Sequence, residues 1–498
     1  MRYLSAILCC YCFLIIDTAK CKGTFVMNDN CIIAYKNIID LKLEKGSSVL
    51  SKEKLDNPQN LIPLYLENFI DFLKLFLGEN KVECKKTEKY KSIRLKQLEA
   101  GDKSSPYYLF TQAEVYLQWA FIHIKFQEYL SSAREINEAY SLLEKNQKLF
   151  PKFILNKKGL GILHALIGTI PDKYKWIANI AGFQGTVKQG IFELSDLFLN
   201  AYNQPKYNYL LPESLFYLNF LTSSLSNDEA ELNTLYKWQL KLDTIKSPLY
   251  LYSKASLLKK KGENDKIISM LQNRQKSVDQ FQFHYLTYIL GESKLFKLDY
   301  SAITYFEEYI KNFKGLNFIK ASWLRISWAH LINGNIEKYK LAMANLLKYG
   351  NAFVDEDKYA ENEAKRGNIP NITLLKARLL FDGGYYSRSL SLLLEKEPSQ
   401  YASNPKDFAE FYYRLARNYH QLKKFDDALK FYQLCLNKSI NINEYFIPNA
   451  ALQMGLIYEK QGNITKAKEY LNKCLNMDDC DYKSGIDQKA KAALSRMK

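Results

Sequence analysis

The sequence predicts an all-α fold, an α-solenoid of stacked antiparallel helix pairs. Glycine (21) and proline (12) are scarce among the 498 residues. Together they make up about 7% of the chain, against a usual total of about 12%. This scarcity favours long helices with brief turns over a turn-rich β protein. Turn signals also recur with a period of about 36 to 39 residues, which indicates a repeat array.

The N-terminus is expected to be an export signal. Arg2 gives a short basic start, and residues 3–16 form an apolar run that is too short to span a bilayer. We therefore predict a signal peptide over residues 1–21 and an exported protein, periplasmic or associated with the outer membrane. A buried first helix is the alternative. Cys21 is a doubtful lipid anchor, because Lys20 stands where lipidation requires a small residue.

Five cysteines lie beyond the predicted signal: Cys31, Cys84, Cys435, Cys474 and Cys480. In an oxidising compartment Cys31 can bridge to Cys84, and two of the three C-terminal cysteines can form a second disulfide. Free buried thiols are the equal alternative. No spacing among cysteines and histidines suits zinc, so no metal site is expected.

The next region, residues 22–105, is predicted to be helical. Leu61–Leu77 is apolar apart from four polar residues on one narrow stripe, which predicts a largely buried helix and argues against a membrane span. Lys85–Lys96 carries six cationic residues. They form either a basic patch or, as we favour, a solvated helix face.

Residues 106–247 are expected to form irregular helical hairpins. Tyr107–Leu149 has the pattern of one long hairpin with alanines and Trp119 at core positions. Gly159–Leu194 follows, with a glycine-rich apolar helix, a stop at Pro171 and a turn at residues 182–185.

Residues 248–498 are predicted to consist of repeats. The clearest unit, Tyr412–Leu436, reads Y-x2-L-A-x2-Y and continues with Ala428 and Tyr432, and the next unit has Gly455 and Ala467 in register. This spacing matches the tetratricopeptide pattern. Small residues let the two helices of a unit approach closely, and each unit needs a neighbour to bury its apolar face. Cys435 and Cys474 share one repeat position and are expected to fill the core.

Earlier repeats are less regular but keep the same punctuation. We predict turns at Gly262, Leu298, Gly334 and Gly384, and later ones at Lys423 and Gly462. The interval from Gly334 to Gly384 exceeds the repeat period, which predicts an insertion around Asp355–Ile369.

Gly159–Leu194 and the last two repeats resemble the tetratricopeptide repeat domain 39 family, which includes the yeast inclusion-clearance proteins. Those proteins also place a proline, a hydrophobic helix and a G-F-x-G turn ahead of C-terminal repeats. The resemblance implies an adaptor rather than a catalyst, because the family is linked with lipid handling and protein-aggregate clearance. The predicted signal peptide departs from the intracellular members, so the chain looks like a bacterial-type exported relative.

Motifs of catalysis are missing from the sequence. It contains no HExxH, GxxxxGK[ST] or GxSxG motif, and its five histidines are dispersed. We therefore predict no catalytic residue, no cofactor and no enzymatic activity.

The formal net charge is +17, but basic residues alternate with acidic ones and no nucleic-acid motif accompanies them. The expected partners are a protein or peptide, with acidic character, and an anionic membrane surface.

The first functional hypothesis is a non-enzymatic scaffold of the cell envelope, which binds a peptide or helix on the concave face of the solenoid. In this repeat class the first helix of each pair lines that face. The candidate partner-binding residues are Arg378, Phe381, Tyr413, Arg417, His420, Gln421, Asn449, Leu456 and Lys460. The alternative is that these are ordinary exposed residues.

The second hypothesis is a carrier of lipid or another small hydrophobic ligand. It depends on the apolar hairpin at residues 159–185, with Tyr174, Trp176 and Phe183 near its tip as candidate ligand or membrane contacts. The alternative is a core hairpin that covers the front of the solenoid.

Overall fold

The computed structural model describes residues 22–170, 182–225, 228–242, 246–275, 277–438, 442–478 and 480–497. The predicted signal peptide, Tyr174 and Trp176 lie outside these ranges. The chain divides into two compact units. Unit 1 contains the described residues up to Phe76 and Lys81–Leu163, and unit 2 contains Leu77–Asn80 and the described residues from His164 onward. The expected domain bounds at residues 105 and 247 stay predictions.

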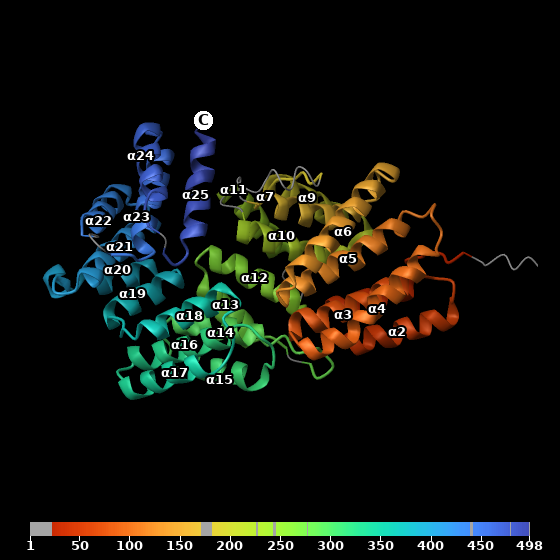
Figure 1. Ribbon diagram of the computed structural model, residues 1–498, viewed down its shortest axis with the longest axis horizontal. Coiled ribbons are helices and arrows are strands. Elements are labelled where there is room, and N and C mark those ends of the chain that lie inside the picture. Colours follow the sequence, from red (N-terminus) through yellow and green to blue (C-terminus); the bar gives the residue numbers. More distant parts are fainter. Residues whose placement is uncertain are drawn as a thin grey trace, which may run out of the picture. The chain divides into compact units, whose positions relative to one another are not determined.

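Unit 1 is built from antiparallel helices (Figure 1). They are α1 (Asp29–Ile39), α2 (Leu43–Asp56), α3 (Ile62–Gly78), α4 (Lys81–Glu99), α5 (Tyr107–Lys125), α6 (Tyr129–Leu149) and the start of α7 (Asn156–Gly168). The predicted apolar helix is α3, and the predicted long hairpin is α5 with α6. Trp119 and Ala139 are fully buried in that hairpin, as expected for core positions.

A buried carboxylate fixes the first segment of unit 1. Glu53 on α2 accepts hydrogen bonds from the side-chain amides of Asn28 (2.7 Å), Asn30 (2.9 Å), Asn57 (3.2 Å) and Asn60 (2.9 Å). Burial raises the pKa of Glu53, but the amide hydrogen bonds, led by that of Asn60, outweigh burial and hold the pKa below its usual value. The carboxylate thus joins the residues before α1 to the turn after α2.

The regular secondary structure described in unit 2 is also helical. Its first elements are α9 (Val187–Asn203), η1 (Pro205–Leu210), α10 (Leu211–Leu225) and α11 (Glu229–Lys241). Helix pairs follow, namely α12 (Pro248–Lys260) with α13 (Asn264–Gln272), α14 (Tyr285–Phe296) with α15 (Ala302–Asn312), and α16 (Ile319–Ile332) with α17 (Ile336–Lys348). After α18 (Asp355–Arg366) come α19 (Ile372–Asp382) with α20 (Tyr386–Leu394), η2 (Pro398–Tyr401), α21 (Pro405–Gln421) with α22 (Phe425–Asn437), α23 (Phe446–Lys460) with α24 (Ile464–Leu475), and α25 (Lys483–Arg496).

The paired helices confirm the predicted all-α solenoid. Each predicted turn contains a residue with positive φ: Gly262 (71°), Leu298 (64°), Gly334 (80°), Gly384 (80°), Lys423 (62°) and Gly462 (76°). The predicted insertion is α18, which packs against α16 and α17. Among the described residues, we find no helix with both the length and the hydropathy that crossing a bilayer requires.

Small residues pack at the helix crossings, as the repeat pattern predicts. A Cβ on Gly455 would come within 2.6 Å of Leu471 Cγ, so the close approach of α23 and α24 requires a very small residue there, unless Leu471 shifts. Cys435 and Cys474 are fully buried free thiols, and burial raises the pKa of Cys474 to about 11. Cys31, Cys84 and Cys480 are free as well.

Turns of the first and fourth helix pairs of unit 2 touch each other. A Cβ on Gly384 would lie 2.5 Å from Gly262 Cα. Beside this contact, Asn264 donates a hydrogen bond to the Tyr385 hydroxyl (3.1 Å), which itself donates to Asp265 (2.9 Å). The array therefore curls back on itself, and the first helices of its pairs share an inner side.

Candidate interaction surface

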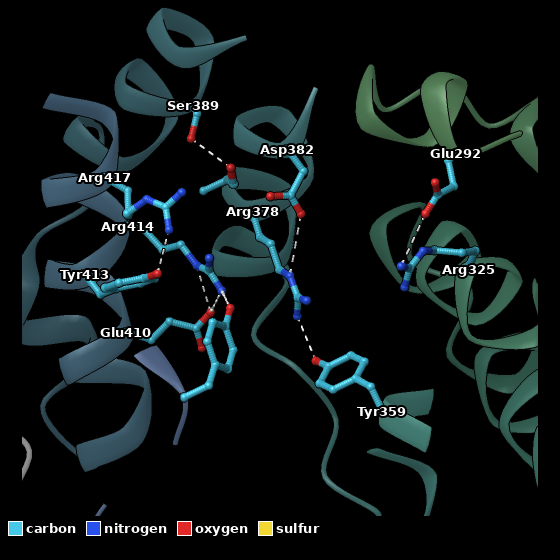
Figure 2. Close-up of polar contacts among 12 residues, drawn as sticks. Glu292, Arg325, Tyr359, Arg378, Asp382, Ser389, Glu410, Tyr413, Arg414 and Arg417 are labelled. Carbon is cyan, nitrogen blue, oxygen red and sulfur yellow. Dashed lines mark hydrogen bonds and ion pairs between the residues drawn. The ribbon is translucent and has the colours of Figure 1, made fainter. Parts of the chain in front are cut away.

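Charged side chains follow the first helices of successive pairs in unit 2. Lys259 Nζ on α12 lies 3.1 Å from Glu292 Oε2 on α14. Glu292 Oε1 in turn lies 3.4 Å from Arg325 Nη2 on α16, as Figure 2 shows. The guanidinium groups of Arg325 and Arg378 both lie over the Trp328 ring, 4.6 Å and 5.0 Å from its centroid. These contacts join four consecutive first helices through ion pairs and cation–π contacts.

Arg378 on α19 stands at the middle of this row. Its Nη1 donates to the Tyr359 hydroxyl of α18 at 2.8 Å, and its Nε lies 3.8 Å from Asp382 (Figure 2). Its guanidinium also lies 5.9 Å from the centroid of the Tyr445 ring. The charge is therefore held mainly by aromatic rings and hydroxyls, with one distant carboxylate.

Two arginines on α21 continue the row. Arg414 Nη2 donates to Glu410 at 2.7 Å and to the Tyr445 hydroxyl at 3.0 Å. One helical turn further on, Arg417 donates to the Tyr413 hydroxyl at 2.9 Å (Figure 2). Its guanidinium also lies 4.5 Å from the Phe381 ring centroid. We call the set Lys259, Glu292, Arg325, Arg378, Arg414 and Arg417 the arginine ladder.

The α21 end of the ladder carries excess positive charge. Among the described residues, no carboxylate lies within ion-pair distance of Arg417, Lys460 or Lys489. Burial, and then the charges of Arg417, Lys423 and Lys460, together lower the pKa of His420 to about 4, so the imidazole is neutral at pH 7. Burial, and then Arg417, also lower the pKa of Lys489 on α25. Arg417, Lys423 and Lys460 therefore lie close enough to His420, and Arg417 to Lys489, to make the electrostatic potential at the α21 end positive.

The segment before α25 lies against the same side of the solenoid. The Tyr482 ring centroid is 5.5 Å from that of Tyr359 and 5.8 Å from that of Tyr445. Asp481 accepts a hydrogen bond from Arg366 on α18 at 2.7 Å. The approach to Arg378 and Arg414 is therefore narrowed by the C-terminal residues of the chain.

The predicted partner-binding residues differ in how much of each side chain is exposed. Arg378 and Arg417 belong to the arginine ladder, and Gln421 and Lys460 are exposed. His420, Asn449 and Leu456 are partly buried. Phe183, the described member of the second candidate set, is also partly buried.

Two placements need correction, because Tyr413 and Phe381 are not exposed. Tyr413 is 1% exposed and Phe381 is 8% exposed. The Tyr413 ring packs 5.6 Å from that of Phe446 on the next first helix. Both rings lie beneath the guanidinium of Arg417 and support it from the core, so neither presents a surface to a partner.

Sequence reasoning missed Lys259, Glu292, Arg325 and Arg414. A signal exists for these residues. Each lies 3, 6 or 9 residues before the left-handed residue of its own turn. The offset is 3 from Lys259 to Gly262, 6 from Glu292 to Leu298, and 9 from Arg325 to Gly334 and from Arg414 to Lys423. A spacing in steps of three keeps them on one side of their helices.

The helical part of the apolar hairpin at residues 159–185 is mostly buried, whereas Thr169, Gly182 and Gln184 are exposed. Leu160, Ile162, Leu163 and Ala165 are each less than 5% exposed. A Cβ on Gly185 would come within 2.6 Å of His164 Cα, so the turn packs directly on the helix backbone. These contacts fit the core-hairpin alternative. In the described ranges, no group of three or more acidic, cysteine or histidine side chains is arranged to hold a metal ion.

One comparison with known protein families agrees with the predicted repeats. Residues 407–479, which span α21 to α24, match the tetratricopeptide repeat family. No curated protein matches the chain. Among solved structures, the chain is similar to one in the crystal structure of the APC/C hetero-tetramer Cut9-Hcn1, at 14% identity over 91% of this chain and 86% of that chain, with a TM-score of 0.28. The matched repeats contain Arg414 and Arg417.

Proposed function

We propose that the protein is a non-enzymatic scaffold that binds an acidic segment of a partner protein beside the arginine ladder. A solenoid of tetratricopeptide type supports protein–protein interaction in general, because its stacked helices expose a long continuous surface. The observation that carries the acidic specificity is the unbalanced positive charge around Arg417, Lys460 and Lys489.

The side chains at this end favour carboxylates over other ligands. A planar guanidinium binds a carboxylate through two parallel hydrogen bonds, and stacking on an aromatic ring fixes its orientation beforehand. Arg417 is oriented in this way by Phe381 and Tyr413.

A binding measurement with a simple acidic probe tests the proposal. The probe is a fluorescein-labelled 12-residue oligoglutamate, read by anisotropy, with oligoglutamine as the neutral probe. The test variant is Lys460→Gln with Lys489→Gln, both exposed side chains. The control, Lys430→Gln with Lys468→Gln, removes the same charge from the second helices α22 and α24.

We expect the test variant to bind oligoglutamate about tenfold more weakly, and the control to change binding less than about twofold, because a nearby charge counts most within a Debye length of about 8 Å. Equal weakening in both variants would show that only net charge matters and would overturn the site. Binding of oligoglutamine with the same affinity would overturn the acidic specificity.

We also propose, from the pattern of residues 1–21, that the scaffold acts in the cell envelope. Fractionation of cells that produce the full chain tests this, together with N-terminal sequencing of the purified protein. The expected result is an envelope fraction and a new N-terminus near Cys21. An intact Met1 in a cytosolic fraction would contradict it.

The resemblance to the tetratricopeptide repeat domain 39 family is likewise a proposal, supported by the sequence pattern of residues 159–194.

A further inference from the structure

Helix α4 in unit 1 has two different faces. Cys84, Thr87, Leu95 and Leu98 are buried, and they form the side that packs on the rest of the unit. On this side the cations are paired, since Arg94 Nη1 lies 2.7 Å from Asp71 on α3 and Lys91 forms an ion pair with Glu135 on α6. These contacts fix the rotation of the helix about its axis and thereby decide which residues point outward.

The outward side is basic and apolar at once. Apart from the exposed amide Gln97, seven exposed residues fall, at about 100° per residue, within an arc of about 140°. They are Val82, Lys85, Lys86, Lys89, Tyr90, Ile93 and Lys96, which we call the α4 outer face. The acidic residues of the helix, Glu83, Glu88 and Glu99, project outside this arc.

The lysines of the α4 outer face differ from the cations on the inner side. Among the described residues, no carboxylate lies within ion-pair distance of Lys85, Lys86, Lys89 or Lys96. Between them, Val82 is 65% exposed, Ile93 50% and Tyr90 44%. An apolar side chain gains nothing from such exposure in water, whereas burial against a partner would remove this surface from water.

We propose that the α4 outer face binds the surface of an anionic phospholipid membrane, with the helix lying in the plane of the headgroups. Lysines there attract acidic headgroups, while valine, isoleucine and tyrosine enter the boundary between headgroups and acyl chains. Nucleic acid would use the lysines, but phosphates and riboses offer no complement to Val82 and Ile93. The membrane accounts for both kinds of side chain, and the proposal stands apart from the scaffold function.

Vesicle flotation with the full chain tests this proposal. The vesicles contain phosphatidylcholine with 30% phosphatidylglycerol, or phosphatidylcholine alone. One variant removes charge (Lys85, Lys86, Lys89 and Lys96, each →Gln), and a second removes only apolar surface (Val82→Ser with Ile93→Ser). A matched control changes four exposed lysines of unit 2 to glutamine: Lys424, Lys430, Lys466 and Lys468. Circular dichroism verifies that every variant is folded.

The expected result is that the wild type and the control float with the anionic vesicles, whereas the charge variant binds at least tenfold more weakly. The apolar variant should bind about threefold more weakly, and neutral vesicles should bind none of the proteins. Failure of the wild type to float would overturn the proposal, as would equal loss in the control. If the charge variant loses affinity for a 20-base-pair DNA duplex but keeps its vesicle binding, the face serves nucleic acid and the proposal is wrong.

Discussion

Helices α4 and α21 are both rich in cationic side chains, but those of α21 pack against other side chains whereas many of those on α4 are exposed to water. On α21, Arg414 and Arg417 point to the inner side of the solenoid and lie against tyrosine, phenylalanine and a carboxylate. On α4, Lys86 and Lys89 point to water. The comparison shows that the kind of cation follows its surroundings. A guanidinium tolerates partial burial because it stacks and forms several directed hydrogen bonds, while an ammonium is strongly hydrated.

The largest effect should come from removing an inner cation. Arg414→Ala leaves Glu410 and the Tyr445 hydroxyl without their donor in a site where the arginine side chain is only 6% exposed. We expect the free energy of unfolding to fall by about 3 kcal/mol, as for other broken buried pairs. Urea denaturation of the full chain, wild type and Arg414→Ala, measures this change in the free energy of unfolding.

The matched change on the outer face is Lys89→Ala, which should alter the free energy of unfolding by less than about 0.5 kcal/mol. Similar losses in the two variants would show that burial does not separate the two helices energetically.

The second prediction concerns pH. Because the pKa of His420 is lowered to about 4 in the folded chain, the unfolded chain binds a proton first as the pH falls. Stability from this group is fully present above the unfolded pKa of about 6.5 and is lost as the pH falls toward 4. Relative to His420→Gln, the wild type should lose on the order of 1 kcal/mol between pH 6.5 and pH 5.

Urea denaturation at the two pH values gives this difference between the proteins. An equal pH dependence in wild type and His420→Gln would mean that burial and the neighbouring cations do not lower the pKa of His420. Added oligoglutamate should raise the pKa of His420, which an NMR titration of the imidazole detects.

The third prediction exchanges arginine and lysine at one position on each helix, Arg417 on α21 and Lys89 on α4. Arg417→Lys keeps the charge but loses the stacked, planar donor over Phe381, so oligoglutamate binding should weaken about fivefold. The reciprocal change, Lys89→Arg, should leave vesicle binding within about twofold, because headgroup attraction there depends mainly on charge. An unchanged affinity of Arg417→Lys for oligoglutamate would show that the charge at this position matters and that the planar shape of the guanidinium does not.

The smallest effect should come from the residue that narrows access to the inner side. Tyr482→Ala removes the ring that contacts Tyr359 and Tyr445 and should open the approach to Arg378 and Arg414. We expect oligoglutamate affinity to rise about threefold, measured by anisotropy. Vesicle binding should not change, since the α4 outer face is in the other unit. A loss of oligoglutamate affinity would instead assign Tyr482 to the binding surface itself.

Local features of this fold follow from sequence because they depend on near neighbours. The turns at Gly262, Gly334 and Gly462 adopt positive φ, as their glycines predict. The small residue at Gly455 lies at the predicted helix crossing. The burial of Tyr413 was not predictable in the same way, because the ring that covers it, Phe446, belongs to the next pair.

By itself, therefore, the sequence determined the helices, their turns, the insertion at α18 and the small residues at the crossings, since these depend on spacings of three, four or about 36 residues along one chain. Only the tertiary structure decided which charges meet. Glu292 pairs with both Lys259 and Arg325 because the stacking of successive pairs brings three helices to one side. It also decided that α4 turns Lys86 and Ile93 outward, because its rotation depends on contacts with α3 and α6.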